Sequence, residues 1–216
     1  MTKEFVLEHI KKNRVFSLIR KEEKFAPYDI ARALIDGGLT TIEISMDIPN
    51  VTEVIDKLKP ENILLGACSV ITAQQVQLAI QAGAQFIDTP VMEMSVIKFS
   101  KGDAKVPLIV GASTANEAYE SWKLNTLYTK IFPTKAMGGV DYITYMMHIM
   151  PFLRVIASSG ITTDDFTDYL DAGAAAVGLG RTLYEGISTL NDITVKARAV
   201  RTKLDEYLEQ EALKNS

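Results

Sequence analysis

The sequence has little of several residue types on which broad classes of protein depend. Cys68 is its one cysteine, so no disulfide can form within the chain, and a secreted, disulfide-stabilised fold gains no support. The two histidines, His9 and His148, lie far apart and form no ligand-spaced cluster. No apolar run reaches the roughly 20 residues that a membrane span requires. These absences predict a cytoplasmic protein without a metal site.

Blocks of like charge are missing as well. Charged residues make up 23% of the 216 residues and the formal net charge is −4, so neither a nucleic acid nor a membrane is an expected partner. The hydrophobic fraction of 47% can form one substantial core, which predicts a single domain over residues 1–216 that binds a small molecule. The N-terminal stretch MTKEFVLEHIKKNR mixes charged and apolar residues, unlike a signal peptide, and is expected to form a helix.

Short β-branched or apolar runs alternate with amphipathic, helix-length stretches along the whole chain. This alternation is typical of repeated strand–helix units around a parallel sheet. The expected strands are VFSLIR (15–20), TIEISM (41–46), ILLGACSV (63–70), FIDTP (86–90), PLIVGA (107–112), LYTKIFP (127–133), RVIASSGI (154–161) and AAVGLG (175–180). Eight such units predict an α/β fold, a single (β/α)8 TIM barrel with an N-terminal helix.

Similar glycine turns precede several of these strands. Gly37, Gly83 and Gly173 each follow an expected helix, where a left-handed residue commonly ends it, and their separations fit units of about 23 residues. A doubly wound open sheet is the competing fold, but the first strand is followed by IRKEEKFAP rather than by a glycine-rich turn. The barrel is therefore favoured, and its chemistry is expected where the strands end.

Two charged residues fall inside expected strands and a third ends one. Side chains alternate along a strand, so Lys130 shares a face with Tyr128 and Phe132, while Glu43 lies on the inward face of its own strand. Desolvation is expected to lower the pKa of Lys130 and so make its amine a nucleophile. Arg20 is expected at the mouth of the barrel, where it would attract an anionic substrate.

Each of these residues also has a purely structural interpretation. Lys130 and Glu43 are compatible with a buried ion pair that has no catalytic purpose. Arg20 at a strand end is compatible with an ordinary solvated side chain. The chemical interpretation is that the amine attacks a keto carbonyl to give an iminium ion, while a carboxylate moves the proton.

The chain resembles the KDPG/KHG aldolases, which act on 2-keto-3-deoxy-6-phosphogluconate and 4-hydroxy-2-oxoglutarate. The segment KIFPTKAMGGVDYI (130–143) is similar to their Schiff-base segment, and GGLTTIEISMDIP (37–49) to the segment that carries their acid/base glutamate. The similarity continues through AGAQFIDTP (82–90), PLIVGASTANEA (107–118) and SSGITTDDFTDYLDAGAAAVGLG (158–180). It therefore covers nearly the whole chain.

The resemblance implies a role for ten residues. Lys130 would be the Schiff-base lysine and Glu43 the general acid/base. Arg20, Ser69, Pro90 and Ser158 would line the substrate pocket, and Ser159, Gly160, Gly180 and Arg181 would bind phosphate. No metal or organic cofactor is implied, and the family's usual homotrimer agrees with the apolar segment YITYMMHIM (142–150).

Two departures from the family pattern bear on the substrate. Asp47 stands where the family often has an arginine that holds the substrate carboxylate, and it would repel an anion placed beside it. Arg181 replaces a phosphate-site serine, so it suits either a phosphate or a second carboxylate. The substrate can therefore be phosphorylated or dicarboxylic.

The resulting hypothesis is a lyase, a class I aldolase of carbohydrate metabolism. It would cleave a 2-keto-4-hydroxy acid through a Lys130 iminium to pyruvate and an aldehyde, either glyceraldehyde 3-phosphate or glyoxylate. One alternative is a sugar-phosphate isomerase or epimerase on the same barrel, which needs no lysine nucleophile. Another is a non-catalytic or substrate-shifted relative, because of Asp47 and Val91.

Overall fold

Eight parallel strands close into a barrel in a computed structural model that describes residues 2–214. The strands are β1 (Val15–Ile19), β2 (Thr41–Ser45), β3 (Leu64–Cys68), β4 (Phe86–Thr89), β5 (Leu108–Ala112), β6 (Tyr128–Ile131), β7 (Val155–Ser158) and β8 (Ala176–Leu179). Each strand pairs with the next in the chain and β8 returns to β1. The predicted (β/α)8 TIM barrel is therefore confirmed, and every expected strand is present within three residues of its predicted bounds.

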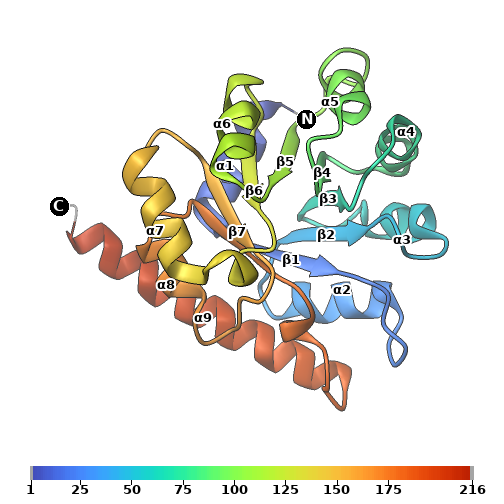
Figure 1. Ribbon diagram of the computed structural model, residues 1–216. Coiled ribbons are helices and arrows are strands. Elements are labelled where there is room, and N and C mark those ends of the chain that lie inside the picture. The colour runs from blue at the N-terminus through green and yellow to red at the C-terminus, as the bar shows by residue number, and fades with distance from the viewer. Residues whose placement is uncertain (1, 215–216) are drawn as a thin grey trace.

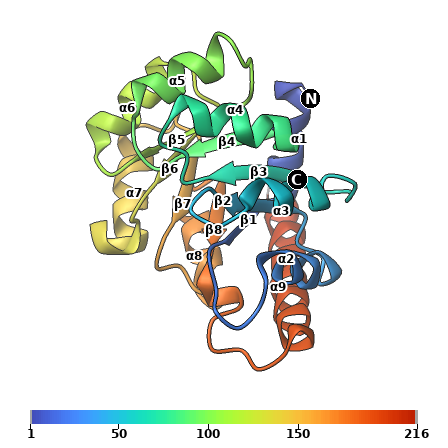
Figure 2. The ribbon, with the colours of Figure 1, turned by 90° about the vertical axis from the view of Figure 1, so that its right-hand side faces the viewer.

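Helices follow the strands and surround the barrel (Figures 1 and 2). They are α1 (Lys3–Asn13), α2 (Pro27–Asp36), α3 (Val51–Leu58), α4 (Ala73–Ala82), α5 (Met94–Lys101), α6 (Ala115–Lys123), α7 (Gly139–Ile149), α8 (Phe166–Asp171) and α9 (Leu190–Lys214), with 3-10 turns η1 (Lys135–Met137) and η2 (Arg181–Leu183). The long helix α9 packs along α2, so the last helix of the barrel covers the first strand–helix unit. Over the described residues, every helix is too short or too polar to span a bilayer.

The predicted N-terminal helix α1 covers the end of the barrel at which the strands begin. Val6 and Ile10 of α1 are fully buried and join the apolar cluster inside the barrel, which contains Phe16 and Phe86. The two phenylalanine rings meet edge to face, with centroids 5.8 Å apart. Apolar side chains therefore fill the half of the barrel nearest the start of the strands. The half nearest the end of the strands is left for polar groups.

The glycine turns before the strands need one correction. Gly83 and Gly173 have φ values of 121° and 98°, as the helix-ending interpretation requires. Gly37 instead has a helical φ of −83°, and Gly38 has the positive φ of 94°. Gly37 does follow the helix, but the left-handed position of the first turn is Gly38, because either glycine of the pair can adopt that conformation.

Candidate active site

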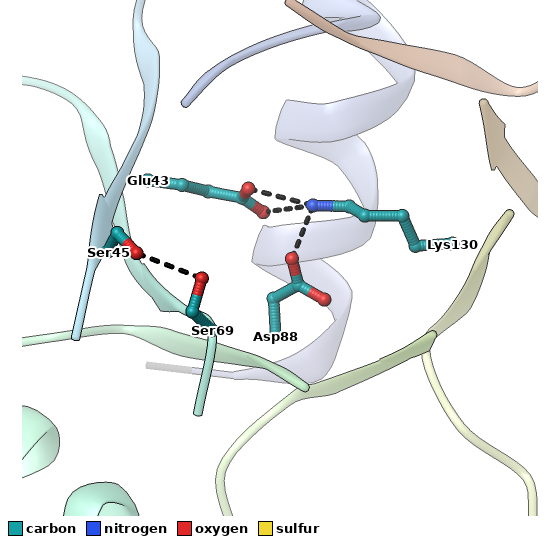
Figure 3. A network of polar contacts seen from close by, with 5 residues as sticks. All are labelled: Glu43, Ser45, Ser69, Asp88 and Lys130. Carbon is teal, nitrogen blue, oxygen red and sulfur yellow. Dashed lines mark hydrogen bonds and ion pairs between the residues drawn. The ribbon is translucent and has the colours of Figure 1, made fainter. Parts of the chain in front are cut away.

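The predicted inward faces of β2 and β6 bring Lys130 and Glu43 into direct contact (Figure 3). Lys130 Nζ lies 2.9 Å from Glu43 Oε1 and 2.7 Å from Oε2. The two strands are four positions apart in a ring of eight, so this ion pair crosses the barrel interior. Glu43 is fully buried and Lys130 is 3% exposed. Strand alternation predicted that both side chains point inward, and the closed barrel brings them together.

A second carboxylate, which the sequence analysis missed, completes the group. Asp88 on β4 places Oδ2 2.5 Å from Lys130 Nζ, and its side chain is buried (Figure 3). The signal was present in the sequence, because alternation from the inward Phe86 puts Asp88 on the same face of its strand. We call Lys130, Glu43 and Asp88 the charged triad.

The charged triad reverses the predicted direction of the lysine pKa. Desolvation lowers the pKa of Lys130, as expected, but the negative charges of Asp88 and Glu43 together outweigh that effect and raise it. The resting amine is therefore an ammonium ion that donates to three carboxylate oxygens. The prediction was wrong because it considered burial without the two charged neighbours.

Both carboxylates of the triad have raised pKa values. Burial is the main cause for Glu43; attraction to Lys130 opposes it and repulsion from Asp88 adds to it, so the pKa of Glu43 rises to about 7. Burial likewise raises the pKa of Asp88, against the attraction of Lys130. Near neutral pH the triad can therefore gain or release a proton on a carboxylate, as acid/base chemistry requires.

A cavity of about 630 Å³ opens above the triad, where the strands end. Of the ten residues that the sequence analysis named, all but Glu43 contribute to its wall. The lining residues among them are Arg20, Ser69, Pro90, Lys130, Ser158, Ser159, Gly160, Gly180 and Arg181. The wall also includes Asp88, Cys68, Phe132, Thr162 and Glu185, which the sequence analysis did not assign to the site.

Two serines of the cavity wall have unusual backbone conformations. Ser69 has φ 59°, and its Oγ accepts a hydrogen bond from Ser45 Oγ at 2.9 Å (Figure 3). Ser159 has φ 81° and the following Gly160 has φ 80°. Non-glycine residues at positive φ carry strain and concentrate at functional sites. The consecutive pair at 159–160 directly follows β7, in a loop of the kind that commonly binds anions in barrels of this type.

Arg20 and Asp47 interact at the rim of the site. Arg20 Nη1 lies 3.8 Å from Asp47 Oδ2, and both side chains are substantially exposed. The Arg20 backbone N–H donates to Tyr184 Oη at 3.1 Å, which fixes the end of β1 against the segment after β8. Asp47 is therefore a neighbour of the arginine rather than an isolated negative charge beside the pocket.

Cys68 is packed inside the barrel and is 1% exposed. Burial raises the pKa of its thiol, and the nearby carboxylates of Glu43 and Asp88 raise it further. A neutral thiol is a weak nucleophile, so the role of Cys68 is to pack inside the barrel. Within residues 2–214, His, Cys, Asp and Glu side chains form no group of three suited to a metal ion.

The comparisons with known proteins agree with this geometry. The family model described as KDPG and KHG aldolase matches residues 6–195. The chain belongs to the KDPG and KHG aldolase family. It is therefore an enzyme, a lyase of the class I pyruvate aldolase type.

Individual members of the KDPG and KHG aldolase family show how broad the similarity is. The chain is 30% identical to 2-dehydro-3-deoxy-6-phosphogalactonate aldolase of Escherichia coli (strain K12), over 77% of this chain and 82% of that protein. It is 28% identical to KHG/KDPG aldolase of the same organism, over 71% of each. A solved structure described as native KDPGal superposes with a TM-score of 0.81 at 27% identity, covering 90% of this chain and 96% of that one.

The raised pKa values predict how stability depends on pH. Because the folded state holds Glu43 at a pKa of about 7, above the ordinary value of 4.5, it binds more protons than the unfolded state between those pH values. The free energy of unfolding should therefore fall as pH rises through that window, by up to about 3 kcal/mol.

Urea unfolding of the wild type and of Glu43→Gln at about pH 5 and about pH 8 measures this dependence. Lys130 stays protonated in both states over this range, so it adds no slope. In the variant, the free energy of unfolding should depend much less on pH, and the remaining dependence should be due to Asp88. If the free energy of unfolding of the variant depends on pH as strongly as that of the wild type, Glu43 is not the cause of this dependence.

Proposed function

We propose that this aldolase cleaves a 2-keto-4-hydroxy acid to pyruvate and an aldehyde, with Lys130 as the Schiff-base nucleophile. The observation that carries the proposal is a buried amine at the floor of a cavity, held by two carboxylates that can take its proton. The amine attacks the ketone, and the carbinolamine loses water to give an iminium ion. That ion withdraws electrons from the C3–C4 bond, which then breaks.

Glu43 is the proposed general acid/base of the cycle. It can accept a Lys130 proton across a contact of 2.7 Å and return it to the hydroxyl that leaves the carbinolamine as water. Cleavage also needs a base for the 4-hydroxyl proton, which Glu43 would serve directly or through water. The enamine product is then protonated at C3 and hydrolysed to pyruvate, with no metal or organic cofactor.

The two ends of the cavity suit the two ends of such a substrate. Arg20 at the end of β1 offers a guanidinium to the carboxylate beside the ketone, with Ser69, Pro90 and Ser158 around it. Ser159, Gly160, Gly180 and Arg181 lie together at the ends of β7 and β8 and would hold a phosphate.

A phosphorylated six-carbon substrate such as 2-keto-3-deoxy-6-phosphogluconate, or its galactonate isomer, is the favoured choice. The cavity of about 630 Å³ has room for it, and the relatives described above are named as a 2-dehydro-3-deoxy-6-phosphogalactonate aldolase and a KHG/KDPG aldolase. The aldehyde product is then glyceraldehyde 3-phosphate. The dicarboxylic 4-hydroxy-2-oxoglutarate, which would yield glyoxylate, is the second candidate because Arg181 suits a carboxylate too.

We also propose that the working form is a homotrimer of a single catalytic domain in the cytoplasm. Aromatic side chains gather on the surface between α6 and the end of α7, where Trp122 and Phe152 have ring centroids 4.7 Å apart and Tyr119 stacks on Trp122. Tyr145 and Ile149 of α7 are each 73% exposed. An apolar surface of this extent is typical of a subunit contact.

Borohydride trapping tests the nucleophile. Wild type incubated with pyruvate and borohydride should gain the mass of one reduced pyruvyl group, and peptide mapping should locate it on Lys130. Lys130→Ala should gain none. Lys135→Ala is the matched control, because Lys135 is exposed on η1 close to the cavity, and it should still be labelled. If the folded wild type forms no adduct, the proposed Schiff-base mechanism is wrong.

Arg181→Ala tests the proposed phosphate site. Loss of a charged donor to phosphate should raise KM for the phosphorylated substrate by roughly 10- to 100-fold and change kcat less. Arg198→Ala, on the exposed face of α9, controls for the loss of a positive charge. If KM rises for 4-hydroxy-2-oxoglutarate and not for the phosphorylated substrate, the arginine binds a carboxylate instead.

Light scattering tests the assembly. The wild type should have the mass of three chains, and Trp122→Glu should dissociate it, because a buried unpaired charge is costly at an apolar contact. Val195→Glu changes a residue of similar exposure on α9, outside the aromatic surface, and should leave the trimer intact. A wild type that is monomeric, or a Trp122→Glu variant that stays trimeric, contradicts this interface.

A further inference from the structure

The two carboxylates of the charged triad differ in how they face the cavity. Asp88 and Lys130 form part of the cavity wall, whereas Glu43 is fully buried beneath them and does not. A base that takes a proton from substrate must lie within hydrogen-bond reach of the substrate. Of the two carboxylates, Asp88 is the one that lines the cavity in which a substrate would lie.

Their hydrogen bonds to Lys130 differ as well. Glu43 uses both oxygens on Nζ, at 2.9 and 2.7 Å. Asp88 uses only Oδ2, and its Oδ1 is buried without a hydrogen-bond partner among the described residues. An unpartnered buried carboxylate oxygen is costly, so Asp88 is less fully satisfied than Glu43 while the ammonium ion is in place.

Formation of the iminium ion frees more of these oxygens. The ammonium ion donates three hydrogens to three carboxylate oxygens, whereas an iminium nitrogen keeps a single N–H. At least two of the three contacts therefore end when the substrate is attached. Glu43, enclosed beneath Lys130, can keep the remaining bond, which leaves Asp88 beside the substrate chain.

We propose that Asp88 is the carboxylate that moves protons on the substrate, while Glu43 serves the Lys130 nitrogen. In cleavage, Asp88 accepts the 4-hydroxyl proton as the C3–C4 bond breaks and the aldehyde leaves. It then returns that proton to C3 of the enamine, which restores the iminium ion and the carboxylate. Because C3 is two bonds from Nζ, a carboxylate that touches Nζ lies close enough for this transfer.

This inference rests on the proposed Schiff-base function and refines it. It reassigns to Asp88 the substrate-side proton transfer that the family resemblance gives to Glu43. Glu43 keeps the transfers that make and hydrolyse the iminium ion. The two carboxylates therefore predict different defects when each is replaced.

Two measurements with pyruvate separate the two roles. Borohydride trapping reports formation of the iminium ion on Lys130. Exchange of the pyruvate C3 protons in D2O, followed by NMR, reports proton transfer on the attached substrate. In Asp88→Asn, trapping should stay within about threefold of the wild type, whereas C3 exchange and kcat for cleavage should fall by about 100-fold. In Glu43→Gln, trapping itself should fall, and exchange should fall with it.

The controls keep these outcomes interpretable. Asp56→Asn removes a negative charge from the exposed face of α3 and should behave as the wild type. Asp88→Asn is isosteric and replaces one of two mutually repelling carboxylates, so thermal melting should show it folded. Asp88→Glu retains a carboxylate and should recover exchange to at least tenfold above Asp88→Asn; no recovery would count against the proposal.

The opposite pattern overturns the assignment. If Asp88→Asn exchanges C3 protons at the wild-type rate, or if Glu43→Gln is trapped normally but does not exchange, Glu43 is the substrate base. A wild type that is never trapped would instead contradict the Schiff-base function itself, so the two failures are distinguishable.

Discussion

Lys130 meets Glu43 across the full width of the barrel and meets Asp88 from the side, and the site depends on this buried three-way contact. Each charge would cost several kcal/mol to bury alone. Placed together from β2, β4 and β6, the three groups compensate one another's charge, and the ammonium ion donates to three of the four carboxylate oxygens. A closed barrel makes this arrangement available, because strands on opposite sides point their side chains at one another.

The apolar layer beneath the triad supports it. The Lys130 ammonium lies 5.3 Å from the centre of the Phe16 ring, within cation–π range, and Phe16 in turn packs edge to face on Phe86. Gly66 makes room for this layer, since a Cβ there would lie 2.2 Å from the Phe86 ring. Water is thereby kept from the floor of the site, which strengthens the interactions between the triad charges.

Strand periodicity explains both what the sequence could predict and what it could not. Alternation along β2 and β6 is a local property, so it identified the inward Glu43 and Lys130 and, with eight repeats, the barrel. The sign of the lysine pKa shift depends on how many charges from distant strands lie close to one nitrogen. That number depends on how the strands are placed relative to one another, which no local sequence pattern shows. Asp88 was missed for a related reason, since β4 is only four residues long and its alternation is a weak signal.

The Arg20–Asp47 contact bears on how a substrate carboxylate would use this arginine under the proposed function. An exposed ion pair at 3.8 Å contributes about 0–1 kcal/mol, because solvent screens it and both side chains lose freedom. A bidentate carboxylate at shorter range forms a stronger, charge-assisted bond with the same guanidinium. Under the proposed function, Asp47 would therefore be a partner that a substrate carboxylate could replace on Arg20, and its negative charge would disfavour binding only weakly. The absence of the family's usual arginine at this position is thus compatible with a keto-acid substrate.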